Sequence, residues 1–207
     1  MKKTLYSLFL IIICAFIFIS CGKKPATIVK EYEKAYNSHD VNKLVSLFSD
    51  GAVIELTPIN KLKSLSQIKG YAEFDSVLNS HITISDISES NGRAFFVMNK
   101  ENDFLKTIGI DSAKYSMIFK IDGGKIIDIS GSTTVETDNK FKKFQDPFML
   151  WAARERLDVL NEIMPGGSIV YNAKNAKKYL ELVLEWKRNN IPAFIKPPAG
   201  KKSVSYR

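Results

Sequence analysis

The sequence has few of the side chains that enzymes and metal sites commonly use. Its 207 residues include two cysteines, Cys14 and Cys21, and two histidines, His39 and His81. The chain beyond Cys21 therefore has neither a disulfide nor a thiol nucleophile. Each histidine stands without a second histidine or suitably spaced carboxylates near it, a pattern that favours solvated side chains over metal ligands.

Other signatures of chemistry are missing as well. We find no glycine-rich phosphate loop, no nucleophile elbow and no cysteine–histidine pair. The net charge of +8 suits anionic lipid or nucleic acid. We expect an ordinary solvated basic surface and no nucleic-acid partner. No cofactor and no metal is expected.

The first 24 residues carry the most informative pattern that is present. A Lys-Lys pair precedes an apolar run over residues 8–19, which Ser20 and Cys21 close. This is the plan of an export signal. The run is about a dozen residues long, whereas a helix that spans a bilayer takes about 20. The sequence therefore predicts a cleaved signal, with an uncleaved anchor, or a signal cut near Ser20 without acylation, as alternatives.

The four residues Phe18-Ile19-Ser20-Cys21 resemble the lipobox of bacterial lipoproteins, in which the signal is cut before a cysteine that becomes the acylated first residue. The resemblance implies a signal peptide over residues 1–20, lipidation of Cys21 with palmitate among its acyl chains, and a short tether over residues 21–26. Stable anchoring requires more than one acyl chain. We expect a protein of the bacterial cell envelope, held on a membrane through Cys21 and facing outside the cytoplasm.

Helical periodicity begins soon after this tether. Apolar residues at helical spacing predict three helices before the first long strand region. The second is expected to begin at the cap Asp40 and to end at Ser49-Asp50-Gly51. The third has capping-box spacing between Ser64 and Gln67. The first and third helices are predicted over residues 27–37 and 64–78.

Strand signals follow these helices. A β-branched run over residues 52–57 predicts a first strand that Pro58 ends. From His81 onward the apolar period is two, and glycine-containing turns supply the positive φ that tight hairpins need. A curved, mostly antiparallel meander is expected. Its strands are predicted at residues 81–88, 93–99, 113–121 and 125–134, with a short strand near 105–108.

Beyond residue 137 the pattern returns to helix. Asp146-Pro147 is expected to start one helix, which Pro165-Gly166-Gly167 ends, and apolar spacing predicts another over residues 173–189. We assign residues 137–190 to a helical extension and residues 191–207 to an irregular basic tail. The aromatic residues of the extension are expected to form a core, in preference to a binding patch: Phe141, Phe144, Phe148, Trp151 and Trp186.

The run from Ile28 to Asp40, IVKEYEKAYNSHD, followed by LVSLFSDGAV from Leu44 to Val53, resembles the opening of nuclear transport factor 2-like (NTF2-like) and SnoaL-like domains. The resemblance implies an α+β domain over residues 27–136. Its curved antiparallel sheet would form a cone that the N-terminal helices cover, with a cavity between them and with additional C-terminal helices. Enzymes and binding modules share this fold, so function has to be argued from residues.

One catalytic protein of that fold, ketosteroid isomerase, uses a tyrosine on its first helix, a carboxylate base after its first strand and a protonated acid deeper in the sheet. The resemblance places Tyr32 at the tyrosine position, but Leu56 and Ser116 near the carboxyl positions. Glu55 is adjacent to Leu56, yet strand neighbours point to opposite faces. Isomerase chemistry is therefore not expected.

Two classes of function remain. The favoured one is a non-catalytic ligand-binding or adaptor domain, whose cavity is filled by side chains or accepts a small apolar ligand. The alternative is a lyase, isomerase or hydrolase that works in the same cavity. Candidate ligand-contacting residues are Tyr32, Tyr36 and Asp128, the last only if it faces the cavity with Ile126 and Ser130; otherwise Asp128 faces solvent and the tyrosines are core aromatics. The resemblance also implies self-association into a homodimer as a third option.

Overall fold

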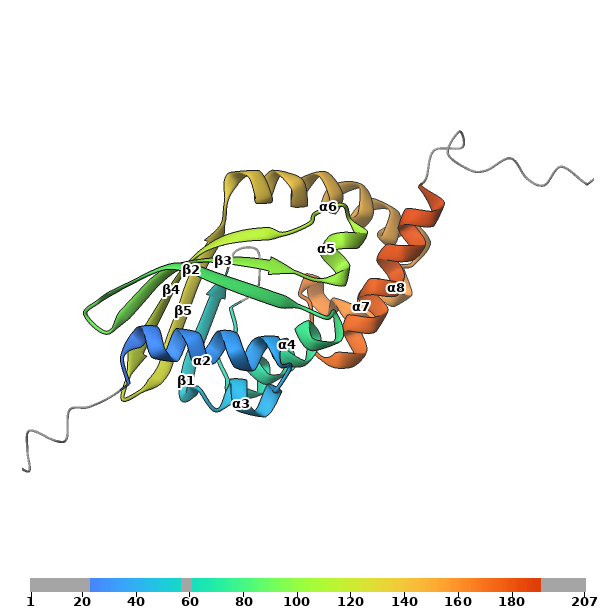
Figure 1. Ribbon diagram of the computed structural model, residues 1–207. Coiled ribbons are helices and arrows are strands. Elements are labelled where there is room, and N and C mark those ends of the chain that lie inside the picture. The colour runs from blue at the N-terminus through green and yellow to red at the C-terminus, as the bar shows by residue number, and fades with distance from the viewer. Residues whose placement is uncertain (1–22, 57–60, 191–207) are drawn as a thin grey trace, which may run out of the picture.

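The computed structural model describes residues 23–56 and 61–190. The expected signal peptide, Cys21, the stop at Pro58 and the tail over residues 191–207 lie outside these residues. Within the described ranges, no helix combines the length and the apolar character that crossing a bilayer requires. The architecture is α+β: helices pack on a curved sheet that does not close into a barrel (Figure 1).

The described elements run from α2 at one end of the molecule to α8 at the other (Figure 1). Their bounds are α2 (Pro25–Asn37), α3 (Val41–Val45), β1 (Phe48–Leu56), α4 (Leu65–Val77), β2 (His81–Ser90), β3 (Arg93–Glu101), α5 (Asp103–Thr107), β4 (Ala113–Asp122), β5 (Lys125–Thr133), α6 (Val135–Glu155), α7 (Leu157–Ile163), the 3₁₀ turn η2 (Pro165–Gly167) and α8 (Ala173–Asn189). We call the sheet together with α2–α5 the cone, and α6–α8 the C-terminal helices.

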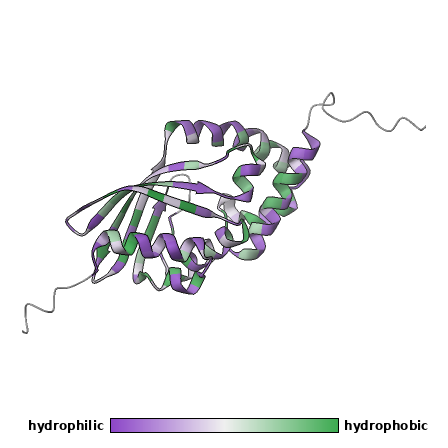
Figure 2. Cartoon of the chain, viewed as in Figure 1, coloured by the Kyte–Doolittle hydropathy of each residue, from purple (hydrophilic) through white to green (hydrophobic). Residues whose placement is uncertain are grey.

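The five strands are ordered β1-β5-β4-β3-β2. Strands β2 to β5 form the expected antiparallel meander, whereas β1 runs parallel to β5 and makes the sheet mixed. No hairpin joins β1 to β5, so their relative direction is set by packing and not by a turn. Hydrophobic and hydrophilic residues alternate along the strands (Figure 2), and the hydrophobic set faces the helices.

The predicted N-terminal helices form, but α2 begins at Pro25, within the predicted tether, and α3 is shorter than expected. Asp40 caps α3 by accepting from the backbone N–H of Lys43 at 2.9 Å, as expected. The helix, however, ends at Val45 and not at Ser49, because β1 already begins at Phe48, where it pairs with β5. Pairing with β5 therefore stabilises this segment more than a further turn of helix would.

Helix α4 contains Gly70 in its interior, and its packing explains why a glycine stands there. The Ser64 hydroxyl accepts from the backbone N–H of Gln67 at 3.3 Å and caps the helix as predicted. A Cβ atom on Gly70 would lie 2.4 Å from the backbone oxygen of Tyr171. Glycine at this position therefore lets α4 approach the segment that leads into α8.

Three predictions for the chain after β3 were wrong. The single helix expected up to Pro165 is divided at Arg156 into α6 and α7. The segment expected as a short strand near residue 105 is helix α5, because Asn102 caps it by accepting from the N–H of Leu105 at 2.7 Å. Helix α6 starts at Val135, capped by Thr134, and runs through Pro147 instead of starting there. Proline removes one intrahelical hydrogen bond, but buried aromatic residues on both sides of it hold the helix together. Helix α8 has the predicted bounds.

The interior is divided among three clusters of buried side chains. The largest fills the cone between α2, α4 and the sheet. The second lies among the C-terminal helices and includes Phe144, Phe148 and Trp151, with Trp186 packed against it, so these aromatics form a core as predicted. Phe141 packs against the cluster of the cone instead. A third small cluster joins α4 to α8 through Phe74. The ring of Phe104 packs against all three, which places α5 at the seam between the cone and the C-terminal helices.

Candidate functional site

A pocket of about 280 Å³ lies at this seam. Its walls come from α4, the ends of β3 and β4, α5 and the C-terminal helices. Most of the lining is apolar or aromatic, the usual composition of a small-molecule site. The aromatic lining residues are Tyr71, Phe74, Phe104, Tyr115, Phe141, Phe144, Tyr171 and Tyr179.

A buried ion pair also lines this pocket. Asp75 of α4 is 3% exposed and Lys100 of β3 is 8% exposed. The Lys100 ammonium lies 2.7 Å from both carboxylate oxygens. Charges removed from water are stable only when paired and fully hydrogen-bonded. The surrounding groups must therefore complete the hydrogen bonding of both residues.

Hydroxyl groups supply the remaining partners. The Tyr36 hydroxyl donates to Asp75 Oδ2 at 2.6 Å, and Ser80 Oγ donates to Oδ1 at 3.4 Å. Lys100 also donates to the Tyr71 hydroxyl at 3.3 Å, and its ammonium lies over the Tyr71 and Tyr36 rings, 5.3 and 5.9 Å from their centroids. The two charges thus cancel within a closed network.

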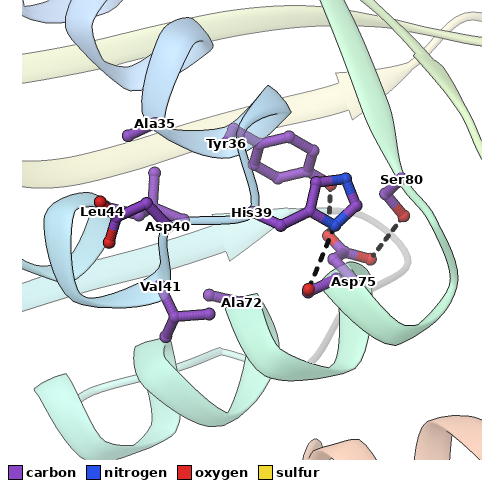
Figure 3. Close-up of a pocket in the computed structure, with 10 residues that line it drawn as sticks. Ala35, Tyr36, His39, Asp40, Val41, Leu44, Ala72, Asp75 and Ser80 are labelled. Atoms are coloured by element: carbon purple, nitrogen blue, oxygen red, sulfur yellow. Dashed lines mark hydrogen bonds between the residues drawn. The ribbon is translucent and has the colours of Figure 1, made fainter.

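A much smaller pocket lies behind Asp75. Its volume is about 10 Å³, which is room for about one water molecule. Figure 3 shows the Tyr36 and Ser80 hydroxyls reaching the Asp75 carboxylate, with His39 beside them. The His39 ring lies 5.2 Å from that of His81, so the fold brings together two histidines that the sequence separates. Within residues 23–56 and 61–190, no group of three or more His, Cys, Asp or Glu side chains could hold a metal.

The tyrosines around the larger pocket stay protonated. Burial raises the pKa of Tyr36, Tyr71, Tyr115 and Tyr171, and the negative charge of Asp75 raises each pKa further. Burial alone raises the pKa of Tyr179, among the same walls. The hydroxyls of Tyr115, Tyr171 and Tyr179 have no hydrogen-bond partner among the described residues. They are neutral donors in an apolar pocket.

Two of the sequence-predicted candidates lie inside the cone. Tyr32 packs edge-on against Phe119, with ring centroids 5.0 Å apart, and fills the space between α2 and the sheet. Tyr36, one turn later, reaches Asp75. Tyr32 is therefore a core aromatic at the back of the cone, while Tyr36 supports the ion pair that lines the pocket.

Asp128 lies on the opposite face of the sheet from these tyrosines. Ile126 pairs with Ile121 and Asp128 with Lys120, so Ile127 is an extra residue in the β4–β5 ladder. This irregularity breaks the simple alternation that put Asp128 on the same side as Ile126. The inward residue is Ile129, which is fully buried, and the structure does not bring Asp128 together with Tyr32 or Tyr36.

Near the two positions at which ketosteroid isomerase has carboxyl groups, this chain has Leu56 and Ser116. Leu56 is buried, while its neighbour Glu55 is exposed and pairs with Lys61 at 2.6 Å. Lys61 also lowers the pKa of the Glu55 carboxyl through that hydrogen bond. Ser116 occupies an outward, exposed position of β4. Glu55 cannot serve the interior of the cone.

Sequence reasoning missed the two residues that dominate the site. Lys100 takes an inward position of β3, continuing the buried series of Ala94, Phe96 and Met98. Asp75 lies among the buried residues of α4. A charged residue at a core position of each element was the available signal, because such residues are almost never fully buried unless paired.

No family model matches this sequence, and no curated protein matches it. Similar solved structures include an NTF2-like protein of unknown function from Cytophaga hutchinsonii, with a TM-score of 0.47, 8% identity, and coverage of 57% of this chain and 96% of that chain. The epoxide hydrolase/cyclase-like enzyme SalBIII, which acts in pyran ring formation in salinomycin, matches with a TM-score of 0.49 and 18% identity, over 55% of this chain and 92% of that chain. A putative polyketide cyclase from Sinorhizobium meliloti matches with a TM-score of 0.45 and 16% identity, over 51% of this chain and 93% of that chain. These likenesses carry neither an activity nor a ligand over to this chain.

Proposed function

We propose that this chain is an exported, lipid-anchored protein of the bacterial cell envelope whose α+β domain binds a small molecule without transforming it. The observation that carries the proposal is the pocket of about 280 Å³ between the cone and the C-terminal helices, with a buried, neutralised ion pair in an otherwise apolar and aromatic lining. A few polar groups in an apolar concavity are the usual make-up of a ligand site.

The hydrogen bonding of Asp75 supports binding without catalysis. Proton abstraction needs a base with a free oxygen within hydrogen-bond reach of the substrate. Both oxygens of Asp75 already accept from Lys100, and Tyr36 and Ser80 add further donors. The alternative enzyme built on Tyr32 and Asp128 lacks its geometry, since those residues lie on opposite faces of the sheet.

The lipid anchor is supported by the sequence around Cys21 and by where α2 begins. Helix α2 starts at Pro25, only a few residues after Cys21. Its first turn lies at the end of the molecule away from α8 (Figure 1). An acylated Cys21 would hold that end against the membrane and leave the C-terminal helices, and the pocket they line, on the far side.

Mass spectrometry of the protein purified from membranes tests both parts of the proposal. The expected N-terminus is an acylated Cys21, and an unmodified Met1 would exclude the anchor. A small molecule should co-purify in stoichiometric amount. Met149→Trp, which places an indole in the pocket wall, should abolish co-purification, whereas Leu150→Trp changes an adjacent residue that is 75% exposed and should not. Equal retention by both variants would place the ligand elsewhere.

A further inference from the structure

We propose that the pocket selects an uncharged, largely apolar molecule of about two rings whose oxygen acceptor is bound by the hydroxyls of Tyr115, Tyr171 and Tyr179. This inference rests on the proposed ligand-binding function and adds the chemical class of the ligand. The charges, donors and dimensions of the pocket support it.

The residues that line the pocket present no unpaired charge to a ligand. Asp75 and Lys100 are the charged side chains among the residues that line it, and they neutralise each other at 2.7 Å. An anion would meet a lysine whose donors already point at Asp75 and Tyr71. An ion left without a partner in such surroundings is strongly disfavoured.

A cation is disfavoured for a separate reason. Aromatic walls beside a carboxylate ordinarily suit an ammonium group. In this protein the Lys100 ammonium already occupies that position, since it lies over the Tyr71 and Tyr36 rings and against Asp75. A second cation would be repelled by the first and would find no free carboxylate in the lining.

The free polar groups of the lining are tyrosine hydroxyls, which can donate as well as accept, and the exposed amide of Gln145. Among the described residues, the hydroxyls of Tyr115, Tyr171 and Tyr179 make no hydrogen bond, although these side chains line the pocket. The Asn102 amide is already used, donating to Ser80 and accepting from the N–H of Leu105. A ligand oxygen such as a carbonyl or ether would accept from tyrosine hydroxyls that have no protein partner among the described residues.

The size and shape of the pocket complete the description. A cavity of about 150 Å³ in another protein holds one benzene molecule, so about 280 Å³ suits a molecule of about two rings. The Tyr171 ring stands nearly perpendicular to those of Tyr71 and Phe74, at 89° and 86°, with centroids 5.2 Å apart in each pair. Aromatic walls of this kind suit a ligand that contains apolar or aromatic rings.

A matched series of naphthalenes tests the class. The probes are 2-acetylnaphthalene, 2-isopropylnaphthalene, naphthalene-2-carboxylate and naphthalene-2-methylammonium, measured by equilibrium dialysis against the full protein in lipid nanodiscs. The Met149→Trp variant in the same nanodiscs gives the background from lipid. We expect the ketone to bind about 2- to 10-fold more tightly than the isopropyl compound, the increment of a neutral hydrogen bond, and both ions to bind at least about tenfold more weakly than the ketone.

Tyrosine-to-phenylalanine variants identify the donors. The triple variant Tyr115→Phe/Tyr171→Phe/Tyr179→Phe should lose the preference for the ketone while binding the isopropyl compound as before. The single variant Tyr171→Phe serves if the triple one does not fold, and Tyr32→Phe, which lies outside the pocket lining, should change neither affinity.

Three results would overturn the inference. Binding of either ion at least as tightly as the ketone, a ketone preference that survives the triple variant, or a charged co-purifying molecule would contradict it while leaving the ligand-binding function intact. If no probe binds above the Met149→Trp background and no molecule co-purifies, the proposed function fails together with it.

Discussion

The cone and the C-terminal helices build their interiors in different ways. The cone encloses a polar network in which Asp75 and Lys100 are held by Tyr36, Tyr71 and Ser80. The cluster among the C-terminal helices is apolar, with Phe144 stacked on Phe148, and the ion pairs of these helices, such as Arg156 with Glu185, lie toward the surface. The pocket arises where the two meet, because the C-terminal helices add apolar walls to a lining that already contains the polar network.

Alkaline pH should have the largest effect, and mainly through the cone. Burial and Asp75 raise the pKa of four tyrosines of the cone above 10.0, namely Tyr32, Tyr36, Tyr71 and Tyr115. Above that pH the unfolded chain loses protons that the folded protein keeps, so stability that is complete below pH 10 falls as the pH rises. The loss is about 1.4 kcal/mol per pH unit for each such tyrosine, or about 5–6 kcal/mol for the four by pH 11. Urea unfolding at pH values from about 8 to about 11, with phenolate absorbance as a second signal, measures it.

Paired variants compare the two regions in that experiment. Tyr36→Phe/Tyr71→Phe should flatten the pH dependence at least as much as Tyr171→Phe/Tyr179→Phe, because Asp75 acts directly on both residues of the first pair but on only one of the second. Phenolate absorbance that rises near pH 10 before the protein unfolds would show that these hydroxyls are solvated.

Breaking the ion pair should have the next largest effect. Lys100→Met leaves Asp75 buried without its cation, which should lower the free energy of unfolding by about 3–5 kcal/mol. Asp75→Asn/Lys100→Met removes both charges and should recover much of the loss. Urea unfolding measures both variants. A loss of about 1 kcal/mol or less for Lys100→Met, the contribution of an exposed pair, would contradict the burial of this network.

Gly70→Ala tests the contact between the two regions. An added methyl group would meet the Tyr171 carbonyl at 2.4 Å, and overpacking of this kind costs about 1–3 kcal/mol. Because Tyr171 lines the pocket, affinity for the co-purifying ligand should fall as well. Alanine is otherwise the better helix former by about 1 kcal/mol, so an increase in thermal stability would show that α4 and the Tyr171 segment are not in close contact.

The smallest effect should come from removing helix caps, one in each region. Asn172 caps α8 by accepting from the N–H of Asn175 at 2.8 Å, and Ser64 caps α4. Asn172→Ala and Ser64→Ala should each cost about 1 kcal/mol. Amide hydrogen exchange separates them: Asn172→Ala should reduce protection mainly in α8, and equal loss of protection in the β-sheet would indicate that the cone and the C-terminal helices unfold as one unit.

Local patterns were predictable wherever a single segment determined them. The caps at Asp40 and Ser64, the meander strands and the bounds of α8 follow from turn residues and apolar spacing within about a dozen residues. The outward position of Glu55 followed from strand alternation in the same way. Helix α6 was misplaced because aromatic packing around Pro147 outweighs the usual preference of proline for a first turn.

What the sequence by itself determined is the N-terminal helices, the hairpins of the cone and the last helix, α8. The export pattern that ends at Cys21 stays a prediction. Only the tertiary structure decided which face Asp128 takes, since one extra residue in β5 reverses strand alternation. It also decided the parallel pairing of β1 and the meeting of Asp75 with Lys100, which lie 25 residues apart. Each of these depends on contacts between distant segments, and a pattern read along one segment carries no information about which partner will face it.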